Sequence, residues 1–285
     1  MTTRGHSPTP SQPSLHEDFR RILDEHGHSF QYAVLKRAQQ LRDAGRSPWQ
    51  HPVEEFPVRV RNRSTHVDFL LSNTSWPALL VAECKRCDPN RRWGFARSPY
   101  ASRDTVFERM YLDKDLLEAN IPARGCLRLA LEREQKPNVF HIGFEIGKGN
   151  QLKDAIAQVT TGANGMLEAL TIEADLLKGM TRSLAGEPLS IVPVVFTTAR
   201  LLITTVDLSS ASLKTGLLPV GEFQASEVPW LFLTTNQSVD LKHERGTSAS
   251  RPPRDLRDII QGFYERTIAV VSPDGIDDFL EMKWA

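Results

Sequence analysis

The sequence has few cysteines and no long apolar run. It contains 3 cysteines in 285 residues, an odd number that argues for reduced thiols rather than a framework of disulfides. No window approaches the roughly 18 consecutive apolar residues that suggest a membrane-spanning helix. The opening MTTRGHSPTPSQPS also lacks the apolar core of a secretory signal. We therefore expect a cytoplasmic protein whose residues 1–14, rich in Pro, Ser and Thr, form a disordered tail.

The chain also lacks net charge, with 35 basic Lys and Arg against 35 acidic Asp and Glu. The distribution is uneven, because residues 36–109 hold 14 basic and 8 acidic side chains. A basic segment inside a neutral chain fits contact with a polyanion such as nucleic acid. Ordinary surface charge explains the same distribution, and both interpretations stay open.

Apolar periodicity predicts helices and strands that interleave along the chain. Helices are expected over residues 14–44 (with a break near Gly27), 105–120, 151–170, 256–266 and 274–284. Strands are expected over residues 55–63, 64–73, 78–86, 126–133, 138–147, 228–236 and 267–273, with two more in 189–208. Residues 87–103 and 236–255 are expected to be loops. This order predicts an α/β sandwich around one mixed sheet.

Two of the expected strands carry an acid in an otherwise apolar run: Asp68 in THVDFLL and Glu83 in LLVAECK. Because side chains alternate along a strand, Glu83 and Lys85 are expected on one face and Cys84 on the other. If these strands are neighbours, Asp68 and Glu83 converge at one end of the sheet. Burying two carboxylates there is costly unless a cation lies between them.

Mg²⁺ suits such a pair, since it takes one or two carboxylates, keeps several waters and accepts phosphate oxygens. Lys85 on the same face would orient or help to deprotonate a water and neutralise charge that builds on phosphorus. Asp68, Glu83 and Lys85 are therefore a minimal set for hydrolysing a phosphodiester. An ion pair between Glu83 and Lys85 at a solvated sheet edge explains the same triplet, so this alternative stays open.

Over about residues 15–170, the chain resembles the PD-(D/E)XK nuclease superfamily in the order of its elements. This order is a helix, a strand, a strand with Asp, a strand with ECK, and a helix. The resemblance rests on THVDFLL, on LLVAECK and on GHSFQYAVLK, which is similar to the opening helix of the family. Gln31 stands where many members have an acid, and Val67 stands before Asp68 where Pro is common. The resemblance implies a restriction-endonuclease-like mixed sheet flanked by helices, and metal-dependent cleavage of DNA or less often RNA. It also covers members that have lost activity.

Strand phase and resemblance together assign catalytic roles to Asp68, Glu83 and Lys85. Mg²⁺, with Mn²⁺ as a substitute, would be held by Asp68, Glu83 and the backbone carbonyl of Cys84. Secondary candidates are Gln31 and Gln158, with Gln151 as the alternative to Gln158. The candidates for nucleic-acid contacts are Arg59, Arg61, Arg86, Arg91, Arg92 and Trp93. Residues 171–285 are expected to form an α/β extension or subdomain that shares the sheet.

The basic and aromatic loop after the ECK motif has two interpretations. Its arginines and the aromatic residues Trp93, Phe95 and Tyr100 can guide a nucleic-acid strand into the site by phosphate contacts and stacking. Alternatively, the aromatic rings tuck into the core.

Other functions are less well supported by the sequence. CKRC, with Cys84 and Cys87, is half of a zinc motif. GKGN at residues 147–150 lacks the spacing of a phosphate-binding loop. No Ser-His-Asp set can be read from the linear order. A nuclease-like protein that binds nucleic acid or assembles without catalysis is the main alternative, since Gln31 replaces an acid. An unrelated α/β protein, in which Asp68 and Glu83 lie far apart, is the third. The sequence leaves DNA or RNA, and monomer or homodimer, open.

Overall fold

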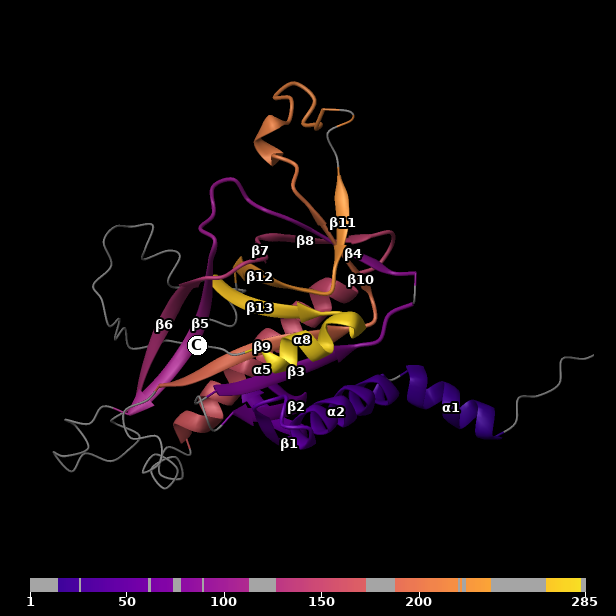
Figure 1. Ribbon diagram of the computed structural model, residues 1–285, viewed down its shortest axis with the longest axis vertical. Helices are drawn as coiled ribbons and strands as arrows, with labels where there is room; N and C mark the ends of the chain where they lie inside the picture. Colours follow the sequence, from indigo (N-terminus) through magenta and orange to yellow (C-terminus); the bar gives the residue numbers. More distant parts are fainter. Residues whose placement is uncertain are drawn as a thin grey trace, which may run out of the picture.

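A large mixed sheet and a second, smaller sheet form the protein, with few helices (Figure 1). The structure is a computed structural model that describes residues 15–25, 27–60, 63–73, 78–88, 90–112, 127–172, 188–219, 221, 224–236 and 265–282. Its α-helices are α1 (Leu15–Glu25), α2 (His28–Asp43), α5 (Gln151–Ile172) and α8 (Ile276–Glu281), with short 3-10 helices at Leu208–Ser210 and Pro273–Gly275. None of the described helices is long and apolar enough to cross a membrane.

The large sheet joins strands from distant parts of the chain in the order β1-β2-β3-β9-β13-β12-β7. These strands are β1 (Trp49–Val60), β2 (Arg63–Asn73), β3 (Ala78–Lys85), β9 (Leu189–Thr197), β13 (Glu265–Val271), β12 (Trp230–Asn236) and β7 (Val139–Phe140). β1, β2 and β3 are antiparallel neighbours, whereas β9 runs parallel to both β3 and β13. β5 (Asp104–Leu112) pairs with the start of β9 and with β6 (Leu127–Gln135).

The second sheet has the order β11-β10-β4-β8. Its strands are β4 (Arg92–Ala96), β8 (Ile142–Ile146), β10 (Arg200–Thr204) and β11 (Ala225–Val228). The parallel neighbours β3 and β9 lead into β4 and β10, which are parallel neighbours again. Thr198, in the connection from β9 to β10, contacts the connection from β3 to β4. Its N–H donates to the Lys85 carbonyl at 3.1 Å. Its hydroxyl accepts from the Cys87 N–H and donates to the Cys87 carbonyl. The end of β3 is therefore held in place.

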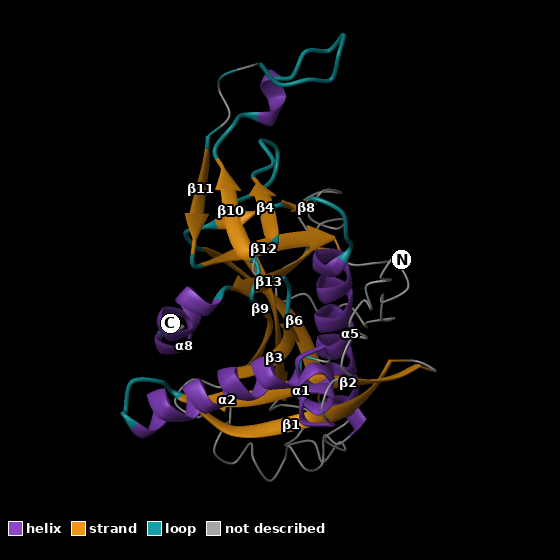
Figure 2. Ribbon diagram, turned by 90° about the vertical axis from the view of Figure 1, so that its right-hand side faces the viewer, coloured by secondary structure: helices purple, strands orange, loops and turns teal. Residues whose placement is uncertain are grey.

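Helices cover both faces of the large sheet, since α8 and α5 lie on opposite sides of it (Figure 2). α2 and α8 share one apolar cluster with residues such as Phe69, Leu80 and Phe196. On the other face, α5 packs against β1, β2 and β3. A Cβ on Gly165 would lie 2.6 Å from the Val58 Cβ, so this glycine lets α5 approach the strands closely.

Most of the predicted elements are confirmed. The expected first helix is broken, because Gly27 adopts φ +77° between α1 and α2. β2 and β3 occupy the expected stretches, whereas β1 begins at Trp49, before the expected start at residue 55. β3 and β9 are almost entirely buried, as runs of apolar residues indicate for central strands.

Two predictions of local structure are wrong. The helix expected over residues 105–120 begins as β5, whose nine residues pair antiparallel with β6, and residues 113–120 lie outside the described residues. Long-range pairing outweighs an apolar spacing that suits either structure. The loop expected over residues 87–103 contains the buried strand β4. The helix expected over residues 256–266 and the tail over residues 1–14 fall on residues outside the description, apart from Glu265 and Arg266 in β13.

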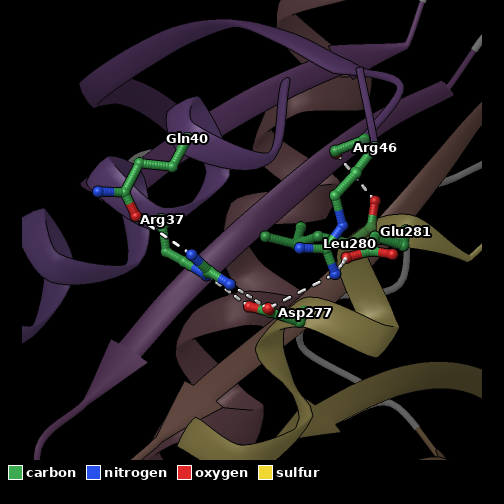
Figure 3. Close-up of polar contacts among 7 residues, drawn as sticks. Arg37, Gln40, Arg46, Asp277, Leu280 and Glu281 are labelled. Atoms are coloured by element: carbon green, nitrogen blue, oxygen red, sulfur yellow. Dashed lines mark hydrogen bonds and ion pairs between the residues drawn. The ribbon is translucent and has the colours of Figure 1, made fainter. Parts of the chain in front are cut away.

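Polar contacts tie α2 to α8, which comes from the other end of the chain (Figure 3). The Arg37 guanidinium donates from Nε to Asp277 Oδ1 at 2.6 Å and from Nη2 to Asp277 Oδ2. Arg46 Nη2 lies 2.5 Å from Glu281 Oε1, and the Ser47 hydroxyl donates to the Leu280 carbonyl at 2.9 Å. Because the hydrogen bonds from Arg37 stabilise its carboxylate, the pKa of Asp277 is lowered.

We predict that Asp277→Asn destabilises the fold at neutral pH by a small margin and not in acid. A carboxyl whose pKa is lowered by folding stabilises the fold above its unfolded pKa, and this contribution is lost as the pH falls through the folded pKa. Thermal unfolding should show a lower Tm for the variant at pH 7 and equal values at roughly pH 2.5. Asp278→Asn, at the neighbouring exposed position, is the matched control. Equal Tm values for the two variants at pH 7 would contradict the prediction.

Candidate functional site

Asp68 and Glu83 lie opposite each other on adjacent strands. β2 and β3 pair up to Phe69 and Ala82, so Asp68 and Glu83 form the next position outward along this antiparallel ladder. The Cys84 N–H donates to Asp68 Oδ2 at 2.6 Å. Lys85 Nζ lies 2.8 Å from Glu83 Oε1. The structure therefore brings together all three residues for which the sequence predicts catalytic roles. Contrary to the third interpretation, the two acids do not lie far apart, but the ion pair between Glu83 and Lys85 that it proposes is present.

The side chains of β3 alternate as the sequence predicts. Ala82 and Cys84 belong to the cluster that contains α2 and α8, whereas Val81 belongs to the cluster under α5. Glu83 and Lys85 have the phase of Val81, so they share the face opposite to Cys84. Their position at the carboxyl end of β3 is next to the crossing between the two sheets, where Thr198 holds the Lys85 carbonyl.

The alternation of β2 is interrupted at Asp68. Val67 packs in the cluster under α5, but Phe69 packs on the α2 and α8 side, although residues two apart on a regular strand share a face. On β1, Glu54 pairs with Phe69 and Phe56 with Val67, which leaves Glu55 opposite Asp68. Glu55 has φ +48°, a conformation that is uncommon for a residue other than glycine. Both strands are therefore irregular at the acids, as is frequent beside active sites.

Gln31 and Glu55 complete the surroundings of Asp68. Gln31 lies in the first turns of α2, is only 3% exposed, and donates from Nε2 to Glu55 Oε1 at 2.9 Å and to the Asp68 carbonyl at 2.8 Å. Glu55 was not among the candidates from the sequence. Its one signal there is the acidic pair Glu54–Glu55 at the start of an apolar strand, and neither the positive φ nor the contact with α2 can be read from that pair.

Burial and mutual repulsion dominate the electrostatics of the two acids. Burial, together with the nearby charge of Asp68, raises the pKa of Glu83 to about 7, although the hydrogen bond from Lys85 opposes this shift. Burial also raises the pKa of Asp68, while the Cys84 N–H lowers it, and the charge of Glu55 adds to the rise for both acids. The acids therefore repel one another at the strand ends, where Lys85 and, for Asp68, His28 supply opposing positive charge. A cation bound here would further relieve this repulsion.

A metal ion here would rely on few protein ligands. In the part of the chain that the structure describes, no group of three or more His, Cys, Asp or Glu side chains is arranged to hold a metal ion. Two carboxylates with a backbone carbonyl and waters are a set that Mg²⁺ accepts. The Cys84 thiol is an unsuitable ligand, because burial raises its pKa well above the ordinary value and only a thiolate binds metal well.

Within the described ranges, the half zinc motif gains no further metal ligand. Cys84 and Cys87 are both free and buried, and Cys87 Sγ lies 3.5 Å from the Thr197 hydroxyl. Cys126 lies outside the described residues. The two described thiols therefore behave as core residues.

The structure corrects one candidate for nucleic-acid contact. Trp93 has 0% exposed surface and packs, with Phe95, in the core between the second sheet and α5, so its ring cannot stack on a base. Two of the expected loop's aromatic residues thus tuck into the core, while Tyr100 is exposed. The reason is that β4 is buried throughout after Arg92, and that Trp93 and Phe95 share an apolar cluster with residues of the large sheet.

The other secondary candidates are spread over the surface. Arg59, Arg86 and Arg92 are exposed. Arg91 donates to the Lys148 carbonyl and lies 3.9 Å from Glu145, so it stabilises the segment that precedes α5. Arg61 lies outside the described residues. Gln158 is exposed beside the buried Val159, so it points away from the sheet, and Gln151 is half-buried at the start of α5.

Comparisons with family models, curated proteins and solved structures found no match for the chain. The class of protein must therefore be inferred from the fold and the site. These are a mixed sheet with helices on both faces, and two converging carboxylates beside a lysine at the end of a central strand.

We predict that Glu83→Gln stabilises the metal-free protein at alkaline pH. The ordinary pKa of Glu83 is 4.5 and the folded value is about 7, so the fold favours the protonated form. The stability contributed by this group is complete below 4.5 and is lost as the pH rises through 7. With EDTA present, the variant should gain about 3 kcal/mol over the parent between pH 4.5 and pH 8, because the pKa of Glu83 rises from 4.5 to about 7 and one pKa unit corresponds to about 1.4 kcal/mol.

Urea unfolding at several pH values measures this difference, with Asp278→Asn as a control on an exposed acid. A difference between Glu83→Gln and the parent that does not change with pH would contradict the assignment of a raised pKa.

Proposed function

We propose that the protein is a Mg²⁺-dependent nuclease that hydrolyses DNA phosphodiester bonds on a restriction-endonuclease-like core. One observation carries the proposal: the Asp68 carboxylate accepts a hydrogen bond from the Cys84 N–H, directly after Glu83, and Lys85 lies 2.8 Å from Glu83. The half-buried carboxylate of Asp68, the buried carboxylate of Glu83 and an ammonium group at one strand end form a set that nuclease chemistry uses. The resemblance of THVDFLL and LLVAECK to the PD-(D/E)XK motifs supports the same conclusion.

Asp68 and Glu83 would hold the ion, with the Cys84 carbonyl as a further ligand. When bound, Mg²⁺ supplies a Lewis acid for a phosphoryl oxygen and lowers the pKa of a water. The Cys84 N–H keeps the Asp68 carboxylate directed toward β3. Lys85, which lies 2.8 Å from Glu83, would orient the attacking water and stabilise negative charge on the phosphate.

Exposed arginines near the sheet edges support binding of a polyanion. Arg59 projects from β1 between the buried Val58 and Val60, and Arg86 follows Lys85 directly. Arg92 begins β4 and is also exposed. Such groups position a nucleic-acid backbone without reading its sequence. They suit RNA as well as DNA, so the substrate is tested with both.

A catalytically inactive nuclease-like protein that binds nucleic acid or assembles with other chains is the second candidate. The observation that favours it is the ion pair between Lys85 and Glu83 at 2.8 Å, in which the two groups satisfy each other. Gln31, in the position where the family often has an acid, uses its amide as a donor rather than offering a carboxylate. A scaffold of this kind would neither bind Mn²⁺ at the two acids nor cleave DNA.

We expect the purified protein to cleave DNA with Mg²⁺ or Mn²⁺ and to lose this activity in EDTA. Lys85→Met keeps the apolar stem but removes the ammonium group, and should lower the cleavage rate by at least about 100-fold. The control is Lys36→Met, at an exposed position of α2. Gel assays on single- and double-stranded DNA and on RNA measure the rates.

Calorimetry with Mn²⁺ separates chemistry from binding. Asp68→Asn and Glu83→Gln should abolish Mn²⁺ binding, whereas Lys85→Met should bind the ion and fail to cleave. Cleavage by Lys85→Met and Glu83→Gln at the parent rate would refute the assigned roles. A parent protein that neither binds Mn²⁺ nor cleaves would favour the inactive scaffold.

A further inference from the structure

We infer that Gln31 is a positioning residue of the proposed nuclease site, required as an amide because it holds Glu55 and the Asp68 backbone together. This inference rests on the proposed function. In this role Gln31 supports the site through its hydrogen bonds. It is not merely the residue that remains where an acidic metal ligand has been lost. The evidence is the hydrogen bonding of Gln31 in a buried position.

The Gln31 amide is fully engaged as a donor. An amide nitrogen carries two hydrogens, and Nε2 of Gln31 donates to Glu55 Oε1 at 2.9 Å and to the Asp68 carbonyl at 2.8 Å. These acceptors belong to β1 and β2, at the two residues where both strands are irregular. The amide therefore joins the strands where their own ladder is interrupted.

α2 holds Gln31 firmly against the sheet. The buried residues of this helix, Gln31, Val34, Leu35, Ala38 and Leu41, form one stripe along it. Gly27 starts the helix with a positive φ, and Arg37 ties its middle to Asp277 of α8. The side chain of Gln31 thus enters the site from a rigid element, as precise positioning requires.

The neighbours of Gln31 explain why a carboxylate would not serve here. Both atoms that face Nε2 are acceptors, the Glu55 carboxylate and the Asp68 carbonyl. An ionised carboxylate has no hydrogen to donate. A glutamate at position 31 would therefore place its carboxylate next to two other acceptors, the Glu55 carboxylate and the Asp68 carbonyl. Glu55 already supplies negative charge opposite Asp68, from a different strand.

The hydrogen bond from Gln31 helps to fix the position of Asp68. Its backbone carbonyl is held by Gln31 on one side, and its carboxylate is held by the Cys84 N–H on the other. Together these contacts set the side chain of Asp68 beside Glu83. Loss of the amide would free the irregular part of β2 and weaken the binding of a cation, although Gln31 itself would touch neither the ion nor the substrate.

The test compares Gln31→Glu and Gln31→Met with Gln39→Glu, an exposed position on the same helix. Mn²⁺ affinity is measured by calorimetry at a temperature at which circular dichroism shows every variant folded, and cleavage is measured against Mn²⁺ concentration. Both Gln31 variants should bind Mn²⁺ about 10–100-fold more weakly, the usual effect of removing a residue that supports a ligand. Gln31→Met should regain cleavage as Mn²⁺ is raised. Gln39→Glu should match the parent.

Glu55→Ala is the second variant, because Glu55 is exposed and its loss leaves no buried cavity. We expect weaker Mn²⁺ binding from it also, so the inference can be tested even if the Gln31 variants do not fold. Tighter Mn²⁺ binding or faster cleavage by Gln31→Glu would show that position 31 is a lost ligand and would overturn the inference. Unchanged Mn²⁺ binding by Gln31→Met or by Glu55→Ala would overturn it too. An inactive parent that binds no Mn²⁺ would refute the proposed function and this inference together, whereas an active parent with unaffected variants refutes the inference alone.

Discussion

The burial of Glu83 at the end of a central strand is the constraint on which the site depends. A carboxylate in this position loses hydration, faces Asp68 on the next strand, and is offset mainly by the ammonium group of Lys85. The surrounding structure keeps the arrangement in place. β3 is paired along its length with β9, its end is held by Thr198, and α5 approaches the sheet closely through its glycines. The acids cannot move apart without breaking these contacts.

Such a site is less stable than a core of apolar residues would be, and this is common where chemistry is performed. The acids at the strand ends repel one another against opposing charge from Lys85 and His28, and a bound cation would relieve this repulsion. A solvated ion pair at a sheet edge would not need the hydrogen bonds that direct Asp68 and Gln31. These hydrogen bonds are the reason for which we propose metal-dependent phosphodiester hydrolysis rather than a purely structural ion pair between Glu83 and Lys85.

Particular residues show how far the sequence could predict this arrangement. Glu83 and Lys85 share a face because strand alternation depends only on neighbouring residues. The sequence left undecided whether Trp93 is exposed or buried, since a basic and aromatic stretch suits a surface loop as well as a strand between two sheets. The segment that forms β5 was misassigned for a related reason: its apolar spacing fits a helix, but pairing with β6 and β9 decides its structure. Glu55 was missed because its role depends on a positive φ and on contact with α2.

The sequence by itself determined the alternation of β3, the break at Gly27 and the buried character of β3 and β9, since these follow from local sterics and from the distribution of apolar residues. Only the tertiary structure decided that Asp68 lies opposite Glu83 and that Gln31 reaches both β1 and β2. It also decided that strands from distant segments share one sheet. The physical reason is that register and helix docking are set by the summed packing of residues far apart in the chain, which no local pattern contains.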